Sequence, residues 1–292
     1  MFSGSIPALV TPFRNGDFAE ADFRDFVEWQ IAEGSAALVP CGTTGEAATM
    51  TFAEHFEVVR VCADQARGRV PVIAGAGSND TRVAIGNVKA AKAAGADAVL
   101  MVPPYYNRPS QEGIFRHFEA VQAECELPII LYNVPGRTVT DIQPATMARI
   151  VKAFPGKFAG VKDATGSLGR VTEQRSGCGA DFAQLSGNDE TALAFNAMGG
   201  VGCISVSANV APRLCADFQA AWAAGDTAKA LELHDRLYPL HIAMFTDASP
   251  GPVKYAVAKL RPGFPGELRL PMTPASEASR AAVDAAMAHA GI

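Results

Sequence analysis

The sequence predicts an α/β fold, a TIM (β/α)8 barrel with a C-terminal helical extension. Eight short runs of nearly continuous apolar residues recur along the chain, and stretches with helical periodicity separate most of them. Such runs are typical of parallel strands that are covered on both faces. Eight strand–helix units within roughly 200–250 residues match the size of this barrel. We place the barrel in residues 1–225 and the extension in residues 226–292.

The eight expected strands are spaced so that a helix fits between most neighbours. They are residues 6–10, 36–40, 70–74, 98–102, 128–132, 158–162, 182–185 and 202–206. A doubly wound open sheet is the alternative. That fold usually carries Gly-x-Gly-x-x-Gly after its first strand, whereas Gly75-Ala76-Gly77 follows the third run and lacks the last glycine.

The expected helices are marked by apolar stripes at helical spacing. Thr51 and Glu54 form a capping-box pattern that starts the second helix. The stripes are Phe23, Phe26, Val27 and Ile31, then Ala84, Val88, Ala91 and Ala94, then Phe115, Phe118, Val121 and Cys125, and last Met147, Ile150 and Val151. Residues 191–198 fit the helix before the last strand, and helical patterns alone follow it, over residues 212–224, 227–246, 252–260 and 276–290.

Composition argues against several classes of partner. The 292 residues carry a net charge of −5 and no basic run, so we expect neither nucleic acid nor an anionic membrane as the main partner. No apolar run approaches the roughly 20 residues of a membrane span. The first residues lack the charged start and apolar core of a signal peptide. We expect a soluble protein of the cytoplasm.

The six cysteines form no C-x-x-C pair and no metal-ligand spacing with histidine. We interpret them as small buried hydrophobes in a reducing compartment, not as a disulfide framework or a metal site. Cys41, beside a glycine-rich loop, is an alternative nucleophile. However, none of the five histidines lies in a motif that marks it as the base for this thiol.

Lys162 is the residue with the clearest chemical meaning, because it ends the apolar run 158–162. Catalytic groups of TIM barrels lie at the carboxyl ends of the strands. Burial disfavours the charged ammonium form, so a lysine there can attack a carbonyl carbon and form a Schiff base. The plain alternative is a lysine that extends to water. Lys254, a rival nucleophile, lies outside the barrel strands.

The other strand ends supply groups that suit imine chemistry and include no histidine. The Tyr132 phenol can relay protons, the turn at residues 42–46 can hold a carboxylate through its N–H groups, and Arg137 can clamp a second carboxylate. Each has a plain alternative, such as an ordinary tight turn or, for Tyr105-Tyr106, aromatic residues of an interface. Residues 186–189 fit either a phosphate site or, more simply, a helix cap provided by Ser186 or Asn188.

Four segments closely resemble the dihydrodipicolinate synthase family, also called 4-hydroxy-tetrahydrodipicolinate synthases, within the N-acetylneuraminate lyase superfamily. They are Gly42-Thr43-Thr44-Gly45-Glu46, Tyr105-Tyr106-Asn107-Arg108-Pro109, Tyr132-Asn133-Val134-Pro135-Gly136-Arg137-Thr138 and Gly160-Val161-Lys162-Asp163-Ala164-Thr165-Gly166. The resemblance runs from the first strand to Leu270-Pro271-Met272-Thr273-Pro274 and so covers nearly the whole chain.

This resemblance implies condensation of pyruvate with aspartate 4-semialdehyde through a pyruvate imine on Lys162, with no other cofactor. It implies catalytic roles for Lys162, Tyr132, Thr44 and Tyr106, with the Tyr106 side chain supplied by a neighbouring subunit. Substrate contacts are implied for Thr43, Thr44, Arg137, Gly187 and the backbone of Ile204. It further implies a homo-oligomer, usually a tetramer built as a dimer of dimers.

Departures from the family pattern affect regulation. Members that lysine inhibits carry His and Glu where this chain has Phe52 and Val83. The remaining candidate allosteric positions, Ala48, His55, Asn79 and Tyr105, still match the family. Losing two polar contacts to an amino acid weakens its binding, so we expect weak or absent inhibition by lysine. Ser249 replaces a family asparagine, and the sequence indicates no reason for this change.

Besides a phosphate-binding barrel enzyme that uses residues 186–189, which would leave Lys162 and Arg137 unexplained, two other functions stay open from the sequence. A pyruvate-dependent aldolase or lyase acting on a 2-keto sugar acid shares Lys162, Tyr132 and the turn at residues 42–46, but Arg137 favours the synthase. A non-catalytic paralogue that only binds pyruvate-like ligands is the other, and the intact set of catalytic residues argues against it.

Overall fold

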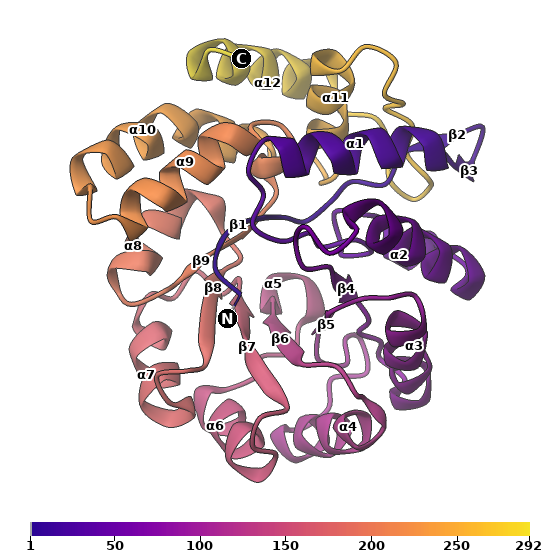
Figure 1. Cartoon of the computed structure of the whole chain (residues 1–292), viewed down its shortest axis with the longest axis vertical. Coiled ribbons are helices and arrows are strands. Elements are labelled where there is room, and N and C mark those ends of the chain that lie inside the picture. The colour runs from indigo at the N-terminus through magenta and orange to yellow at the C-terminus, as the bar shows by residue number, and fades with distance from the viewer. Residues whose placement is uncertain (1) are drawn as a thin grey trace.

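The chain folds as a (β/α)8 barrel, and the computed structural model describes residues 2–292. Seven parallel strands form one curled sheet in the order β1-β9-β8-β7-β6-β5-β4, and helices surround it (Figure 1). The strands are β1 (Gly4–Pro7), β4 (Ile73–Gly75), β5 (Ala98–Met101), β6 (Ile129–Asn133), β7 (Phe158–Asp163), β8 (Ala183–Ser186) and β9 (Gly202–Ser205). The predicted fold class is therefore confirmed.

The second predicted strand, residues 36–40, is not a regular strand. It occupies the gap between β1 and β4, where Ala8 bridges Val39 and Leu38 bridges Val72, both in parallel. These bridges close the barrel but do not extend into a ladder. Proline has no N–H to donate to a ladder, and three prolines lie on this segment and its two neighbours, namely Pro7, Pro40 and Pro71.

Helices cover the outer face of the sheet, and the predicted apolar stripes lie on them. Thr51 caps the second helix as predicted, since its hydroxyl accepts the Glu54 N–H at 3.2 Å. The surrounding helices are α1 (Glu20–Ala32), α2 (Phe52–Ala66), α3 (Thr81–Ala93), α4 (Gln111–Glu124), the short α5 (Pro135–Thr138), α6 (Pro144–Ala153), α7 (Gly169–Cys178), α8 (Ala192–Ala197) and α9 (Pro212–Ala223).

Two apolar clusters hold these layers together. The larger one joins the outer faces of the strands to the helices. The smaller one fills the barrel interior with Ile6, Ala8, Ala37, Val39, Ile73, Ala98, Leu100, Ile130, Tyr132, Val134, Leu185 and Ile204. Burying each large apolar side chain contributes about 1.5–3 kcal/mol. Because Tyr132 and Ile204 belong to the interior cluster, groups aligned with them in register also face inward.

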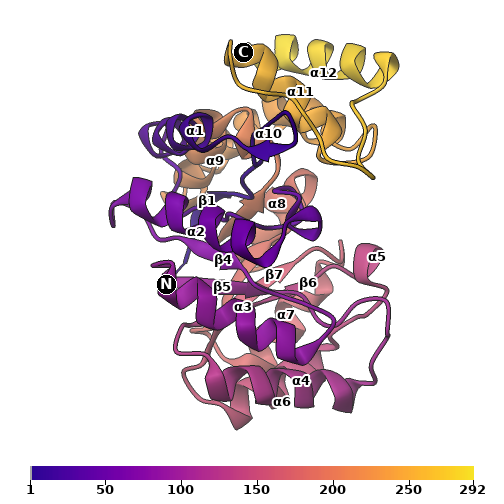
Figure 2. The same cartoon turned by 90° about the vertical axis from the view of Figure 1, so that its right-hand side faces the viewer.

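Three more helices follow the barrel, at the residues where helical patterns predict them. They are α10 (Thr227–Ala243), α11 (Gly251–Leu260) and α12 (Glu277–Ala290). Helix α10 packs along α9, and α12 packs on α10 and α11. Figure 2 shows α11 and α12 together at one end of the molecule. The division of the chain at residue 225 stays a prediction.

Two short strands, β2 (Phe13–Arg14) and β3 (Asp17–Phe18), form a hairpin that is absent from the predicted elements. Asn15 and Gly16 connect them with φ angles of 52° and 85°. Asn-Gly between two strands is the strongest short-range hairpin signal, so the sequence did contain this information. Within the described residues, no helix has the length and apolar character that crossing a membrane requires.

Candidate active site

Lys162 and Tyr132 lie side by side inside the barrel. They are directly paired residues of the parallel strands β7 and β6, and Leu185 of β8 pairs with Lys162 on its other side. Paired residues of neighbouring strands share a face, and both Tyr132 and Leu185 belong to the interior cluster. The Lys162 side chain therefore points inward, where it is 5% exposed. Its Nζ lies 4.4 Å from the centroid of the Tyr132 ring.

The two buried lysines differ in what holds their ammonium groups. Lys254 is fully buried, and its Nζ pairs with the Glu46 carboxylate at 2.5 Å. Among residues 2–292, Lys162 has no such carboxylate partner and its Nζ faces the Tyr132 ring. A lysine that is committed to a buried ion pair is a poor nucleophile. The geometry thus favours Lys162 over Lys254 as the reactive amine.

The turn at residues 42–46 follows the irregular segment 36–40. Gly45 donates its N–H to the Gly42 carbonyl at 3.1 Å, and Glu46 donates to the Thr43 carbonyl at 3.1 Å. The Thr44 side chain is buried, whereas Thr43 is exposed. A Cβ on Gly45 would lie 2.9 Å from the Leu9 carbonyl oxygen. Glycine is therefore required for this turn to pack against the residues that follow β1.

Asp163, next to Lys162, has a structural role. Its carboxylate accepts the Thr165 N–H at 2.9 Å and the Gln174 amide at 2.6 Å. It thereby fixes the loop that leads from β7 into α7. Its carbonyl accepts the Gly187 N–H at 2.7 Å, and a Cβ on Gly187 would lie 2.6 Å from the Ala164 Cβ. Only glycine lets the ends of β7 and β8 approach this closely.

The prediction that Ser186 or Asn188 caps a helix is wrong. Asn188 precedes the 3-10 helix η2 (Asp189–Thr191), but its side chain makes no capping bond. The Ser186 hydroxyl donates instead to the Asn188 carbonyl at 2.8 Å. The buried Asp189 carboxylate accepts the Ser205 hydroxyl and the Val206 N–H. An acceptor-only carboxylate repels an anion, so this loop is also a poor phosphate site.

Tyr105, Tyr106 and Arg137 are displayed at the surface. Tyr106 is 89% exposed and adopts a left-handed φ of 71°, which is uncommon for a bulky residue. Tyr105 is 38% exposed, and the exposed Arg137 lies on α5 directly after β6. A single chain therefore brings together Lys162 and Tyr132, but it leaves Tyr106 with few contacts of its own.

Comparison with known proteins places the chain. The pattern of the Dihydrodipicolinate synthetase family matches residues 1–290. The chain belongs to this family. A 4-hydroxy-tetrahydrodipicolinate synthase from Rhizorhabdus wittichii is 66% identical over 292 residues, which cover 100% of both chains. These family members are lyases, and this chain is an enzyme of the same class.

Two solved structures are similar to the chain over most of their length. The chloride-inhibited dihydrodipicolinate synthase from Acinetobacter baumannii, complexed with pyruvate, is 41% identical with a TM-score of 0.95, covering 100% of both chains. The enzyme from Cyanidioschyzon merolae with lysine bound is 34% identical with a TM-score of 0.95, covering 99% of this chain and 98% of that one.

Of the candidate allosteric positions, Ala48 lies just before α2, His55 in the first turns of α2, Asn79 just before α3 and Tyr105 in the loop before α4. Ala48 is exposed, whereas His55 and Asn79 are half-buried. Burial lowers the pKa of His55, although a hydrogen bond with the Gly75 backbone opposes this shift. Asn107 donates its side-chain N–H to the Asn79 carbonyl at 2.9 Å, which ties the tyrosine loop to the start of α3. Phe52 and Val83 expose 59% and 48% of their surfaces.

The structure does not favour the alternative sites. Burial raises the pKa of the Cys41 thiol well above its ordinary value. Within residues 2–292 this thiol contacts the His55 backbone carbonyl at 3.6 Å, and no histidine ring pairs with it as a base. All six cysteines are free. The part of the chain from residue 2 onward contains no group of three or more His, Cys, Asp or Glu side chains that is arranged to hold a metal ion.

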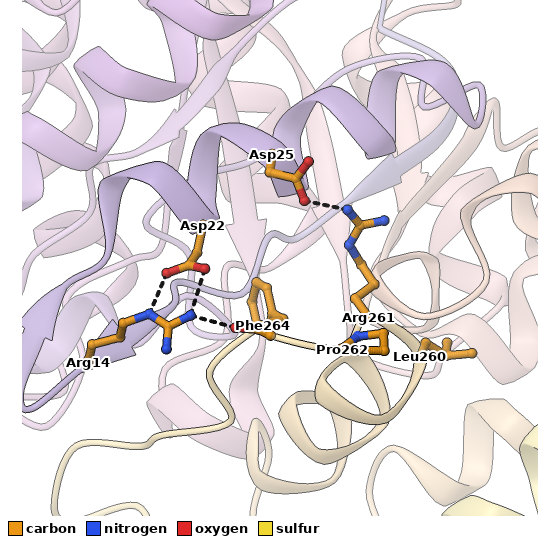
Figure 3. A pocket seen from close by; sticks show the side chains of 8 residues that line it. Arg14, Asp22, Asp25, Leu260, Arg261, Pro262 and Phe264 are labelled. Carbon is orange, nitrogen blue, oxygen red and sulfur yellow. Dashed lines mark hydrogen bonds and ion pairs between the residues drawn. The ribbon is translucent and has the colours of Figure 1, made fainter.

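A separate surface hollow lies between α1 and residues 260–264 (Figure 3). Its charged groups are already paired with one another. The Arg14 guanidinium binds the Asp22 carboxylate, and Arg261 binds Asp25. The hollow contains none of the residues at the carboxyl ends of the barrel strands. We therefore interpret it as a packing gap beside the C-terminal segment and not as the reaction site.

Proposed function

We infer that this chain catalyses the condensation of pyruvate with aspartate 4-semialdehyde to 4-hydroxy-tetrahydrodipicolinate, the first committed step of diaminopimelate and lysine biosynthesis. Beyond membership of the family, one observation carries the inference. The Lys162 amine is buried in the barrel, faces the Tyr132 ring at 4.4 Å and has no carboxylate partner among residues 2–292. No cofactor other than the covalent pyruvate imine is proposed. We propose that the reaction takes place in the cytoplasm.

The first half of the proposed reaction prepares the nucleophile. The Lys162 Nζ adds to the ketone carbon of pyruvate, and loss of water leaves an imine. The imine nitrogen withdraws electrons from the imine carbon. The methyl carbon bonded to that carbon therefore loses a proton more easily, and an enamine forms. The Tyr132 phenol is the proton relay, since its ring already lies against the amine.

The second half joins the two substrates. The enamine carbon bonds to the aldehyde carbon of the acceptor, and the aldehyde oxygen takes up a proton to become a hydroxyl group. This step restores the imine on Lys162. The acceptor's own amine then attacks the imine carbon, displaces the lysine and closes the ring. No oxidant or reductant is needed, and the free lysine returns to its starting state.

The proposed substrate contacts come from the family resemblance, and the positions of the residues support them. Thr43 and Thr44, with the N–H groups of their turn, hold the pyruvate carboxylate. The backbones of Gly187 and Ile204 line the pocket for the same substrate, since Gly187 directly follows β8 and Ile204 lies on β9. Arg137 is exposed on α5 and binds the acceptor carboxylate in a bidentate manner, through two parallel hydrogen bonds.

The proposed assembly is a homo-oligomer in which Tyr106 completes the site of a neighbouring chain. It then relays protons to Tyr132 through Thr44. An aromatic side chain that is 89% exposed on a left-handed backbone is costly in a monomer. The exposed Phe52 and Val83 add apolar surface near the starts of α2 and α3.

A tetramer, a dimer of dimers, needs a second contact surface on each chain. Helix α10 offers one, because it exposes Leu231, Tyr238 and Ile242 in an apolar row at helical spacing, which the exposed Phe245 continues just past the end of the helix. Exposed apolar rows of this kind mark interaction sites more often than isolated apolar residues do. We therefore include the tetramer in the proposal, with this row as its second interface.

A coupled assay with pyruvate and aspartate 4-semialdehyde tests the function. Turnover of this pair, with none of 2-keto sugar acids, is the expected result. Cleavage of a 2-keto sugar acid to pyruvate, without condensation of the semialdehyde, would assign the chain to the aldolase branch of the superfamily instead.

A further inference from the structure

A buried ion pair connects the turn at residues 42–46 to the C-terminal segment. The Lys254 side chain is fully buried and that of Glu46 is 2% exposed, and the pair is 2.5 Å long. Lys254 Nζ also donates to the Glu267 carbonyl at 2.6 Å. Neither residue takes part in the proposed reaction. A buried charge pair is costly unless every group in it is satisfied, so its presence here requires an explanation.

Both charged groups of the pair have further hydrogen-bond partners nearby. The second carboxylate oxygen of Glu46 accepts the backbone N–H of Arg269 at 3.0 Å. The Arg269 guanidinium binds the Glu54 carboxylate at the start of α2 and the Gly16 carbonyl in the hairpin. Lys254 Nζ and Arg269 Cζ lie 4.4 and 4.0 Å from the centroid of the Phe13 ring. Three segments that are distant in sequence, namely the hairpin, residues 46–54 and residues 254–269, therefore meet around this pair.

The same carboxylate belongs to the residue that ends the turn. Glu46 has a left-handed φ of 57°, and its N–H donates to the Thr43 carbonyl. Its carbonyl accepts the N–H and the hydroxyl of Thr49. The preceding Gly45 carbonyl accepts the Thr11 hydroxyl at 2.8 Å. A shift of the Glu46 side chain is thus passed to Thr43 and Thr44 through backbone that is bonded on both sides.

We propose that Glu46 and Lys254 are positioning residues for the pyruvate-binding turn, so that the C-terminal segment from Lys254 to Arg269 holds this turn in its binding shape. The proposal rests on the proposed function, because it assumes that Thr43 and Thr44 bind the pyruvate carboxylate. The pair itself does not touch substrate. The pair acts through the backbone of the turn. Its removal therefore weakens the binding of pyruvate more than the binding of aspartate 4-semialdehyde.

Three variants test the proposal in the full-length enzyme. Glu46→Gln keeps the shape and the hydrogen-bonding reach but removes the charge. Lys254→Met removes the charge and is one heavy atom shorter than lysine, and the double variant removes both charges. We expect the KM for pyruvate to rise by about tenfold or more in each single variant, because small misplacements of binding groups have large kinetic effects. The KM for aspartate 4-semialdehyde should change several-fold less.

Arg261→Met is the matched control. It removes an ion pair between the same C-terminal segment and α1, through Asp25, without touching the turn. We expect its KM for pyruvate to equal that of the wild type. The double variant separates two explanations, since pairing two neutral side chains can restore thermal stability. Restored stability with a KM for pyruvate that stays raised supports positioning, whereas recovery of both indicates a role in stability alone.

The outcomes also separate this proposal from the proposed function. An inactive wild-type enzyme would contradict the function itself. Normal wild-type turnover with an unchanged KM for pyruvate in the folded Glu46→Gln variant would contradict only the positioning proposal. Glu46→Asp provides a milder second variant, because it keeps the charge and shortens the side chain by one methylene. If Glu46→Gln does not fold, an unchanged KM for pyruvate in Glu46→Asp contradicts the proposal in the same way.

Discussion

Lys162 and Tyr132 are directly paired across two parallel strands, and the lysine Nζ lies 4.4 Å from the centre of the tyrosine ring. Parallel register therefore sets the distance between the two groups, and no flexible loop intervenes. Sites built on strands are held more firmly than sites built on loops. The proposed nucleophile and proton relay are thus positioned by the barrel itself.

Replacing Lys162 with Ala should abolish turnover, with a loss of at least about a thousandfold, because no other amine can form the imine. Treating the wild type with pyruvate and borohydride should add one reduced pyruvyl group to Lys162, which peptide mass spectrometry locates. Lys152→Ala, on the exposed surface of α6, is the control and should keep full activity. Normal turnover of Lys162→Ala would end the Schiff-base proposal.

Tyr132→Phe should lower kcat by about 10²–10⁴-fold, the usual contribution of a positioned acid–base group. The ring stays in the interior cluster, so the melting temperature should change little. Steady-state kinetics and circular dichroism measure the two quantities. A kcat within twofold of the wild type would show that another group carries the proton.

Mixed oligomers can test whether Tyr106 acts in a neighbouring site. Lys162→Ala and Tyr106→Phe should each be nearly inactive alone. Co-expressed as a mixed oligomer, they should regain activity, since one of the two sites in a heterodimer then contains both intact residues. Activity that stays at the level of the single variants would indicate that Tyr106 acts within its own chain or not at all.

Acid should destabilise the fold partly through His117. Burial lowers the pKa of His117 from 6.5 to about 4, and its Nε2 is buried without a partner in the described structure. Between about pH 6.5 and about pH 4, His117 is protonated in the unfolded chain but stays neutral in the folded chain. The free energy of unfolding therefore falls as the pH drops through this range. The loss from this group is about 3 kcal/mol.

Urea unfolding at several pH values measures this effect. His117→Asn keeps a polar group near Thr81, whose hydroxyl lies 2.9 Å from His117 Nδ1, but it cannot titrate. Its free energy of unfolding should therefore fall less steeply with acid than that of the wild type. Parallel curves for the two proteins would assign the acid sensitivity to other groups, such as the buried His241.

Lysine should inhibit this enzyme weakly or not at all, because Phe52 and Val83 cannot hydrogen-bond an amino acid. Steady-state assays with added lysine measure the inhibition constant, and a micromolar value would contradict the expectation. Converting both positions together, Phe52→His with Val83→Glu, should increase sensitivity to lysine. Both side chains are exposed in the single chain, so each chain of the double variant should fold normally.

The sequence predicted much of the fold because its patterns are local. Apolar runs and helical stripes locate most strands and helices, and Thr51 with Glu54 marks the start of α2. Helix α7 escaped prediction, since its sequence buries only Val171 and Gln174. The segment at residues 36–40 is apolar like a strand, but local patterns do not show that prolines on both neighbours prevent a ladder.

The proposed site was predictable to a similar extent. Lys162 and Tyr132 end apolar runs, and the alignment of parallel strands brings them together. The partner of Lys254 was not predictable, because Glu46 lies 208 residues away in the sequence. No local pattern records such a contact. A glutamate ending a glycine-rich turn and a lysine beginning a buried helix were the available signals, and neither indicates the other.

The long separation between Glu46 and Lys254 bears on when the enzyme becomes competent during its synthesis. The ribosome has made every residue proposed for catalysis once Ile204 is in place. The ammonium group that anchors Glu46, and the Arg269 N–H beside it, are added only later. We expect a nascent chain that already contains all the barrel strands to bind pyruvate poorly until its last helices leave the exit tunnel.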